Sequence, residues 1–117
     1  MKIFLIGKRG QVGREILIEG KKLGYQIYAF DSKELDVTNH ELVRNKIKSK
    51  KPDVVINTAS YHILSECEKN PDLLFKINVF ASKNIAEVCN ELNIKYVDFS
   101  SDKVFDGNKK KPYVETD

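Results

Sequence analysis

A glycine loop near the start of the chain constrains its fold more than any other feature. The loop consists of residues 7–13, GKRGQVG, and it lies between an apolar run at residues 3–6 and an amphipathic stretch at residues 15–23. A strand, a glycine loop and a helix in this order present free backbone N–H groups and a helix N-terminus to a pyrophosphate. The spacing is G-x-x-G-x-x-G rather than G-x-G-x-x-G, so an ordinary strand-to-helix turn stays open as the alternative.

An acidic residue lies at the distance that a dinucleotide site requires. A second apolar run ends at Asp31, close to the position about 20 residues beyond the glycines where a carboxylate binds the adenosine ribose. Asp31 could accept hydrogen bonds from both ribose hydroxyls of NAD. Arg9, Ser32 and Lys33 could instead favour the 2′-phosphate of NADP, or could be solvated turn residues. We therefore expect NADPH or NADH as the cofactor and leave the choice open.

The composition is typical of one globular domain. The chain has 117 residues, of which 41% are hydrophobic and 32% charged. No apolar run approaches the roughly 18 residues of a membrane span, and the first residues enter a strand with no room for a signal peptide. The net charge is +3, and the basic clusters at residues 46–51 and 109–111 lack the interleaved aromatics of a nucleic-acid site. Cys67 and Cys89 lack metal-type spacing, so we expect reduced thiols in a cytoplasmic protein and no metal site.

Short apolar runs alternate with helical spacing along the chain, which predicts alternating strands and helices. The predicted strands are residues 2–6, 26–30, 54–57 and 95–99, and the predicted helices are residues 11–23, 39–50 and 71–92. Thr38 is the predicted N-cap of the second helix, with Glu41 completing a capping box, and Asn70-Pro71 begins the third. The fold class is therefore α/β, a doubly wound (Rossmann-type) parallel sheet with helices on both faces. We expect the strand order 3-2-1-4, stopping after about four strands.

Four segments in a fixed order are similar to one known family. They are GKRGQVG at residues 7–13, ELDVT at 34–38, KPDVVINTA at 51–59 and SSDKVFDG at 100–107. The set resembles the dTDP-4-dehydrorhamnose reductases, which are extended short-chain dehydrogenase/reductases, and the resemblance covers the whole chain. It implies that residues 1–117 are the NAD(P)-binding portion of an oxidoreductase. That enzyme would reduce the 4-keto group of a nucleotide-linked deoxysugar in dTDP-L-rhamnose synthesis.

The resemblance also implies roles for individual residues. The pyrophosphate would lie on Gly7, Gly10, Gln11, Val12 and Gly13, the adenosine ribose on Asp31, the adenine beside Asp36 and Val37, and the nicotinamide half along Ser60, Tyr61 and His62. Ser101 takes the place of the catalytic Ser/Thr that hydrogen-bonds the substrate carbonyl, and Asp102 would lie next to the sugar. Ser101 could also simply cap its loop. Asn78, within the third predicted helix, is interpreted as an amide bonded to a neighbouring strand.

The family's catalytic Tyr-x-x-x-Lys pair does not occur in residues 1–117, because none of the five tyrosines has lysine four positions later. We therefore expect this fragment not to be a competent reductase on its own. The substrate-binding part would also be absent, and the fourth strand would have a bare edge that favours self-association. Two alternatives stay open: a non-catalytic nucleotide-binding or regulatory subunit, similar to that of methionine adenosyltransferase, and an inert remnant.

Overall fold

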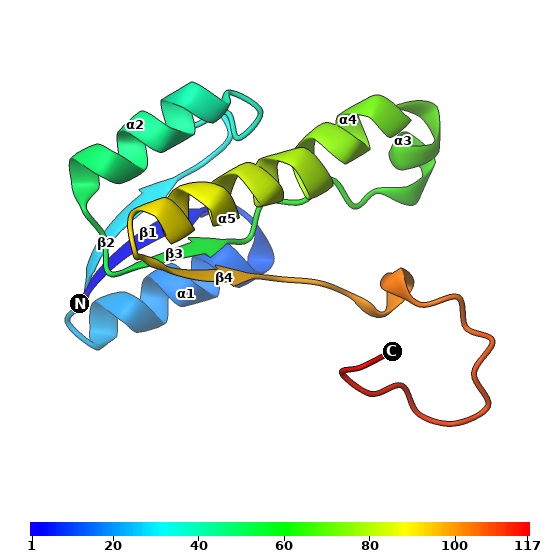
Figure 1. The fold of residues 1–117 in the computed structure, drawn as a ribbon. Coiled ribbons are helices and arrows are strands. Elements are labelled where there is room, and N and C mark those ends of the chain that lie inside the picture. The colour runs from blue at the N-terminus through cyan, green and yellow to red at the C-terminus, as the bar shows by residue number, and fades with distance from the viewer.

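Four parallel strands form one sheet with helices on both faces (Figure 1) in the computed structural model, which describes residues 1–117 apart from the side chain of Leu64. The strands are β1 (Lys2–Ile6), β2 (Gln26–Phe30), β3 (Val54–Asn57) and β4 (Lys95–Asp98). The helices are α1 (Gln11–Lys22), α2 (His40–Lys50), α3 (Leu64–Lys69), α4 (Pro71–Phe75), α5 (Ser82–Glu91), the π-helix η1 (Lys76–Ala81) and the 3₁₀-helix η2 (Asp102–Val104). The predicted fold class is confirmed.

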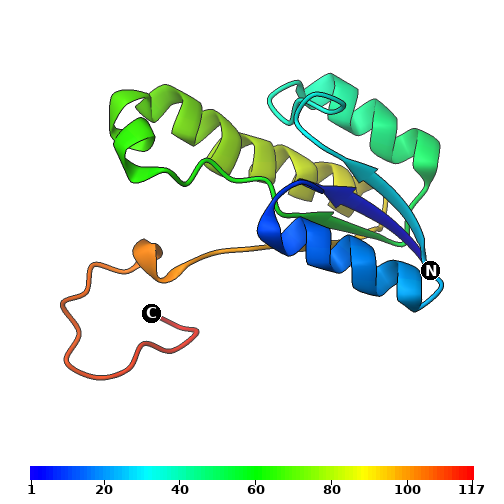
Figure 2. The same ribbon diagram turned by 180° about the vertical axis from the view of Figure 1, so that it is seen from behind.

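Strand β1 carries the alternation that builds a core on each side of the sheet. Ile3 and Leu5 are buried with the partly buried Ile16 and Leu17 of α1. Phe4 and Ile6 belong to the opposite cluster, which contains buried residues of α2 and α5. Successive side chains of a strand point to opposite faces, so a strand buried on both sides reads as a continuous apolar run. Figure 2 shows α1 on the face opposite α2 and α5.

The observed strand order is β2-β1-β3-β4, so the predicted order 3-2-1-4 is wrong. Strand β3 pairs with β1, with Ile3 opposite Val54, rather than extending the sheet beyond β2. A right-handed crossover that passes from β2 back across β1 places its helix on the face opposite α1. Helix α2 lies on that face, where Val43 and Ile47 share a core with Ile85 of α5. The apolar periodicity predicts that these residues are buried but does not specify their neighbours.

The cap of α2 differs from the prediction by one residue. The N-cap is Asn39, whose Oδ1 accepts a hydrogen bond from the backbone N–H of Leu42 at 3.0 Å. Thr38 is engaged elsewhere, because its hydroxyl donates to Asp36 Oδ1 at 2.7 Å. The prediction of Thr38 as the cap is therefore wrong. Asp36 forms a local turn that removes Thr38 from the helix end.

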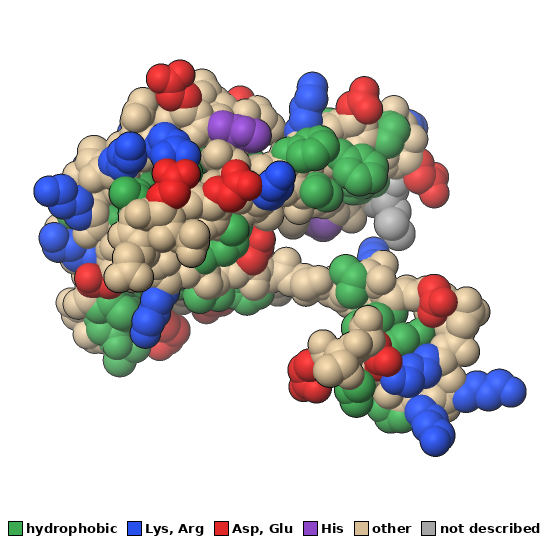
Figure 3. Space-filling view, in the orientation of Figure 1, with side chains coloured by type: hydrophobic (Ala, Val, Ile, Leu, Met, Phe, Trp, Pro, Cys, Tyr) green, Lys and Arg blue, Asp and Glu red, His purple; other side chains and the backbone are tan. Residues whose placement is uncertain are grey.

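The third predicted helix is one continuous rod that contains a π-helical section. Pro71 begins α4, as predicted, while the side chain of Asn70 makes no capping hydrogen bond. The section η1 has six residues, KINVFA, and is followed directly by α5. The short helix α3, which the sequence did not predict, precedes this rod. Hydrophobic side chains lie at the surface of the part of the rod formed by α4 and η1 (Figure 3); Phe75 of α4 is 50% exposed and Phe80 of η1 is 52% exposed.

Strand β4 lies at one edge of the sheet and ends at Asp98, one residue before the predicted end. The chain beyond it extends away from the sheet (Figure 1) and folds back on itself, with the rings of Phe105 and Tyr113 stacked at 4.1 Å. The Tyr113 hydroxyl donates to Asp106 at 3.0 Å. Among the helices that the structure describes, none has the length and apolar character needed to cross a membrane.

Candidate dinucleotide site

Two glycines of the loop are required by close packing. Gly7 has φ +91°, and a Cβ there would lie 2.5 Å from Thr58 Oγ1 and 3.0 Å from the backbone N of Ala59. A Cβ on Gly13 would lie 2.2 Å from the backbone O of Gly7. The Thr58 hydroxyl donates to the backbone O of Ile6 at 2.8 Å and lies 3.2 Å from the backbone O of Gly7, so it ties the end of β1 and the start of the loop to the end of β3. The two glycines therefore bring α1 against the strands.

Gly10 has a different role, because it is the N-cap of α1 and has room around it. Its nearest neighbour for an added Cβ is the backbone O of Gly7 at 3.4 Å. No side chain caps α1, and its first turn contains no acidic residue. The first backbone N–H groups of a helix have no partner within the helix, and the helix dipole makes them a site for an anion. The loop thus offers uncovered donors to a phosphate.

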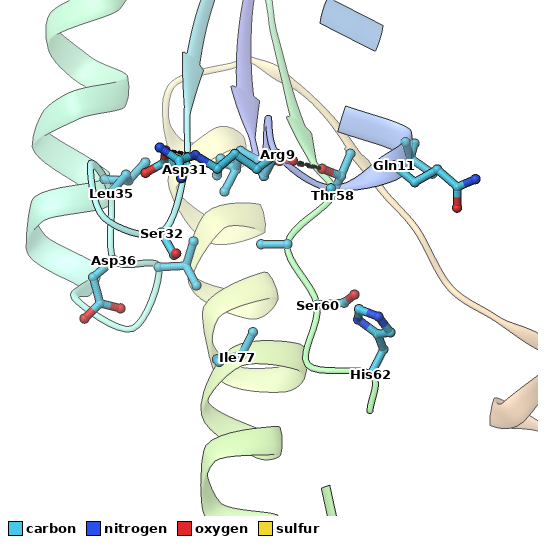
Figure 4. A pocket seen from close by; sticks show the side chains of 16 residues that line it. Arg9, Gln11, Asp31, Ser32, Leu35, Asp36, Thr58, Ser60, His62 and Ile77 are labelled. Carbon is cyan, nitrogen blue, oxygen red and sulfur yellow. Dashed lines mark hydrogen bonds and ion pairs between the residues drawn. The ribbon is translucent and has the colours of Figure 1, made fainter. Parts of the chain in front are cut away.

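A cleft of about 490 Å³ opens over this loop, at the carboxyl ends of β1 and β3. The chain leaves β1 for β2 on one side and later returns to β3 on the other, which makes this edge the topological switch point where open α/β sheets bind ligands. The lining residues are Ile6, Gly7, Arg9, Gly10, Gln11, Val12, Asp31, Ser32, Leu35, Asp36, Val37, Thr58, Ala59, Ser60, His62 and Ile77. In Figure 4, Asp31 and Asp36 lie at one end of the cleft, while Ser60 and His62 lie at the other.

Ten of the predicted cofactor residues line this cleft and two do not. Those that line it are Gly7, Arg9, Gly10, Gln11, Val12, Asp31, Asp36, Val37, Ser60 and His62. Gly13 packs beneath the loop, and Tyr61 contributes backbone contacts to a helix. Sequence reasoning assigned no site role to five further lining residues, namely Ile6, Leu35, Thr58, Ala59 and Ile77. Two signals could have found Thr58: its hydroxyl directly follows the buried β3 run, and it lies within the 51–59 segment that carries the family resemblance.

Asp31 is the buried acidic group of the cleft, with 6% of its surface exposed. Its Oδ1 accepts hydrogen bonds from the backbone N–H groups of Lys33 at 2.9 Å and Glu34 at 3.1 Å. Its Oδ2 lies 2.6 Å from Arg9 Nε. Burial opposes ionisation of Asp31, but the two backbone N–H groups and the charges of Arg9 and Lys8 outweigh it, so the pKa of Asp31 lies below its ordinary value. Asp31 is therefore a carboxylate at neutral pH.

A second ion pair stands beside the first. Lys8 Nζ lies 2.6 Å from Glu34 Oε2, and the same oxygen accepts a hydrogen bond from the backbone N–H of Asp31 at 2.9 Å. The hydrogen bond from Lys8 is the main reason that the pKa of Glu34 lies below its ordinary value. The two pairs join the glycine loop to the turn after β2. The side chain of Lys33 is not part of the cleft lining.

Asn78 holds the far wall of the cleft. Its Oδ1 accepts from the backbone N–H of Tyr61 at 2.8 Å, and its Nδ2 donates to the backbone O of Tyr61 at 2.8 Å. The partner is therefore the loop after β3, and the prediction of a bond to a strand is wrong. One amide satisfies both backbone groups of one residue, which fixes the segment between Ser60 and His62 against η1.

A polar network joins the carboxyl ends of β3 and β4. The buried Asn57 donates to Asp98 Oδ1 and to Ser82 Oγ, each at 3.3 Å, and the Tyr96 hydroxyl donates to Asp98 Oδ2 at 2.8 Å. Burial, followed by the hydrogen bond to Asp98 and its charge, raises the pKa of Tyr96, so this hydroxyl stays protonated. The network fixes the direction in which the chain leaves β4.

Comparison with known proteins identifies the family. A family model described as the RmlD substrate binding domain matches residues 1–117, the whole of this chain. The chain belongs to the RmlD family. Its relatives include the dTDP-4-dehydrorhamnose reductase of Escherichia coli, which is 35% identical over 121 residues that cover 100% of this chain and 40% of that protein. The chain thus spans about 40% of the length of this curated relative.

Solved structures of RmlD family relatives have the same fold. A dTDP-4-dehydrorhamnose reductase from Clostridium acetobutylicum superposes with a TM-score of 0.94 at 39% identity, covering 100% of this chain and 42% of that one. The enzyme from Bacillus anthracis, solved in complex with NADP, gives a TM-score of 0.86 at 32% identity, covering 92% of this chain and 39% of that one. The fold predicted from the resemblance is therefore that of the reductases.

In this RmlD family chain, Ser101 and Asp102 lie outside the cleft. Ser101 is exposed and caps η2, where its Oγ accepts from the backbone N–H of Lys103 at 3.4 Å. Asp102 is the first residue of η2 and is also exposed. Both follow β4, and β4 ends at the same edge of the sheet as β1 and β3 because all strands are parallel. Their roles toward a substrate stay predictions.

Proposed function

We propose that this chain is the NAD(P)H-binding portion of a dTDP-4-dehydrorhamnose reductase. The observation that carries the proposal is the uncapped first turn of α1, which opens into a cleft that ends at the ionised Asp31. An anion-binding helix end and a ribose-binding carboxylate are the two elements that a dinucleotide needs at a switch point. The names of the relatives supply the substrate class, a nucleotide-linked 4-ketosugar.

When bound, NADPH or NADH would supply a hydride to the carbonyl carbon of the sugar, and the proton for the carbonyl oxygen would come from an acid other than the residues assigned here. The glycine loop and Asp31 would hold the pyrophosphate and the adenosine ribose, while Ser60 and His62 would lie along the nicotinamide half. Ser101 would donate a hydrogen bond to the carbonyl oxygen, with Asp102 beside the sugar. Residues 1–117 contain no Tyr-x-x-x-Lys pair. We therefore propose that they bind the cofactor without completing the reaction alone.

A single substitution separates cofactor binding from folding. In Gly10→Ser, the new hydroxyl is a good N-cap and accepts from the first-turn N–H groups that the pyrophosphate would use. The backbone of Gly10, with φ −67° and ψ 162°, suits serine. We expect the free energy of unfolding to stay equal or to rise by a few tenths of a kcal/mol, while the affinity for NADPH and NADH falls. Leu23→Ala, at the exposed far end of α1, is the matched control.

The measurement is isothermal titration calorimetry of each cofactor into the purified chain and the two variants. Saturable binding that Gly10→Ser weakens and Leu23→Ala leaves unchanged would support the proposal. A folded chain that binds neither cofactor would overturn it. Binding that Gly10→Ser leaves unchanged would also overturn it, because the dinucleotide would then lie away from the first turn of α1.

A further inference from the structure

At the end of the cleft proposed to bind the adenosine ribose, an arginine already contacts the carboxylate that a ribose would need. Arg9 Nε lies 2.6 Å from Asp31 Oδ2, and Arg9 reaches Asp31 across the cleft end (Figure 4). We propose that Arg9, positioned by Asp31, binds a 2′-phosphate and makes this chain select NADPH over NADH. The inference rests on the proposed function and adds the form of the cofactor that this site takes.

Asp31 has little capacity left for a ribose diol. Both backbone N–H groups that approach it donate to Oδ1, at 2.9 and 3.1 Å, and Arg9 occupies Oδ2. NAD selection relies on a carboxylate that accepts from the 2′-hydroxyl of the ribose. A buried carboxylate that already accepts two backbone N–H groups and an arginine is better suited to orient the arginine. Asp31 is in this respect a positioning residue for Arg9.

Arg9 keeps N–H donors that the ion pair with Asp31 does not use. A guanidinium carries five N–H donors in a planar fork, and the ion pair to Asp31 uses the one on Nε. The Arg9 side chain is 72% exposed, so both terminal nitrogens are accessible to a ligand in the cleft that it lines. Arginine binds phosphate through two parallel N–H···O bonds, which neutral hydroxyls cannot match in strength.

Two of the three carboxylates at this end of the cleft are paired with cations. Asp31 pairs with Arg9 and Glu34 with Lys8, each at 2.6 Å, while Asp36 accepts hydrogen bonds from the backbone N–H and the hydroxyl of Thr38 at 2.9 and 2.7 Å. The hydroxyl-bearing Ser32 lines the same end of the cleft and could donate to the phosphate. Lys33, the other cation of this turn, is exposed and does not line the cleft. The structure thus separates Arg9 from Lys33, which the sequence left as equal candidates.

The test measures how four nucleotides bind to the unchanged chain and to two variants that each lose one positive charge. We would titrate NADPH, NADH, 2′,5′-ADP and 5′-ADP into the chain, into Arg9→Gln and into Lys33→Gln, which removes the same charge outside the cleft. Hydrogen bonds between a guanidinium and a phosphate are charge-assisted, so Arg9→Gln should weaken the binding of NADPH and 2′,5′-ADP by about tenfold or more. NADH and 5′-ADP should change by less than about threefold. Lys33→Gln should leave all four ligands nearly unchanged.

The outcomes separate this inference from the proposed function. Preference for NADPH that Arg9→Gln abolishes, in a variant that remains folded at the temperature of the titration, supports the inference. Equal affinity for NADPH and NADH, or an Arg9→Gln variant that weakens both alike, overturns it and leaves the proposed function standing. If Lys33→Gln removes the preference instead, Arg9 is not the selecting residue. Failure of all four ligands to bind overturns both proposals.

Discussion

Gly13→Ala should destabilise the fold, whereas Gly20→Ala in the same helix should not. Each substitution adds one methyl group to α1 and gains about 1 kcal/mol of helix propensity. The neighbours differ. The new Cβ at position 20 would lie 2.5 Å from Ile27 Cδ1, the end of a side chain, with the next atom at 3.7 Å. At position 13 it would lie 2.2 Å from the backbone O of Gly7 and 2.8 Å from Thr58 Oγ1.

The magnitude follows from these distances. Real Cβ contacts essentially never fall below 3.0 Å, so α1 must withdraw from the glycine loop by about 0.8 Å, the difference between 3.0 and 2.2 Å. Overpacking costs about 1–3 kcal/mol, and a backbone obstacle puts Gly13→Ala at the upper end, for a net loss of about 2 kcal/mol. A shifted Ile27 rotamer costs about 1 kcal/mol, which offsets the gain in helix propensity. The free energy of unfolding of Gly20→Ala should therefore be close to that of the unchanged protein.

The assay is urea denaturation of both variants, followed by circular dichroism, with the midpoint and slope fitted separately. A Gly13→Ala midpoint clearly below that of Gly20→Ala, with equal slopes, would match the expectation. The reasoning fails if the two variants unfold with free energies within about 0.5 kcal/mol of each other, because the backbone contact would then have no energetic cost.

Three further predictions concern the cleft and the sheet edge. Asn78→Ala removes both 2.8 Å bonds to the Tyr61 backbone, so amide hydrogen exchange at Tyr61 should accelerate and stability should fall by about 1–3 kcal/mol. Because the pKa of Asp31 lies below its ordinary value of 3.8, its carboxylate stabilises the fold at neutral pH. This stabilisation is lost as the pH falls through the pKa of the folded state. Asp31→Asn cannot ionise, so its free energy of unfolding in urea should not show this fall at acidic pH. We propose that the free edge of β4 pairs with a second copy, so light scattering should detect association that Val97→Lys reduces; a monomeric parent chain would contradict this.

The sequence predicted the elements that depend on local pattern. The glycine loop and the alternating apolar runs place every predicted strand and helix within one residue of its observed ends. The strand order was wrong because periodicity specifies which faces are buried, and both sides of β1 are buried alike. The predicted cap of α2 was wrong because Thr38 and Asn39 are both residue types that cap helices. The local turn at Asp36, which decides between them, is a feature of the folded chain.

The cleft was predictable only where its residues are related by local spacing in the sequence. Asp31 and Gly10 follow from spacing to the loop, which is a local relation. The Thr58 hydroxyl contacts the backbone oxygens of Ile6 and Gly7, which lie 52 and 51 positions earlier in the chain, and no pattern in the sequence links them. The ion pair between Arg9 and Asp31 was equally hidden, since it depends on β1 and β2 lying side by side.

The π-helical section η1 lets the rod that walls the cleft carry one residue more than a regular α-helix would. An α-helix turns about 100° per residue, and a π-helix closes wider turns through i→i+5 bonds, so each of its residues turns by less. Loss of one residue from η1 would therefore let the rod continue as an α-helix while α4 and α5 keep nearly the same orientation about its axis. Loss of one residue at the start of α5, before Ile85, would instead rotate Asn78 by about 100° away from Tyr61 relative to the core residues Ile85 and Val88. The position of a deletion along this rod, rather than any exchange of side chains, therefore decides whether the cleft keeps its shape.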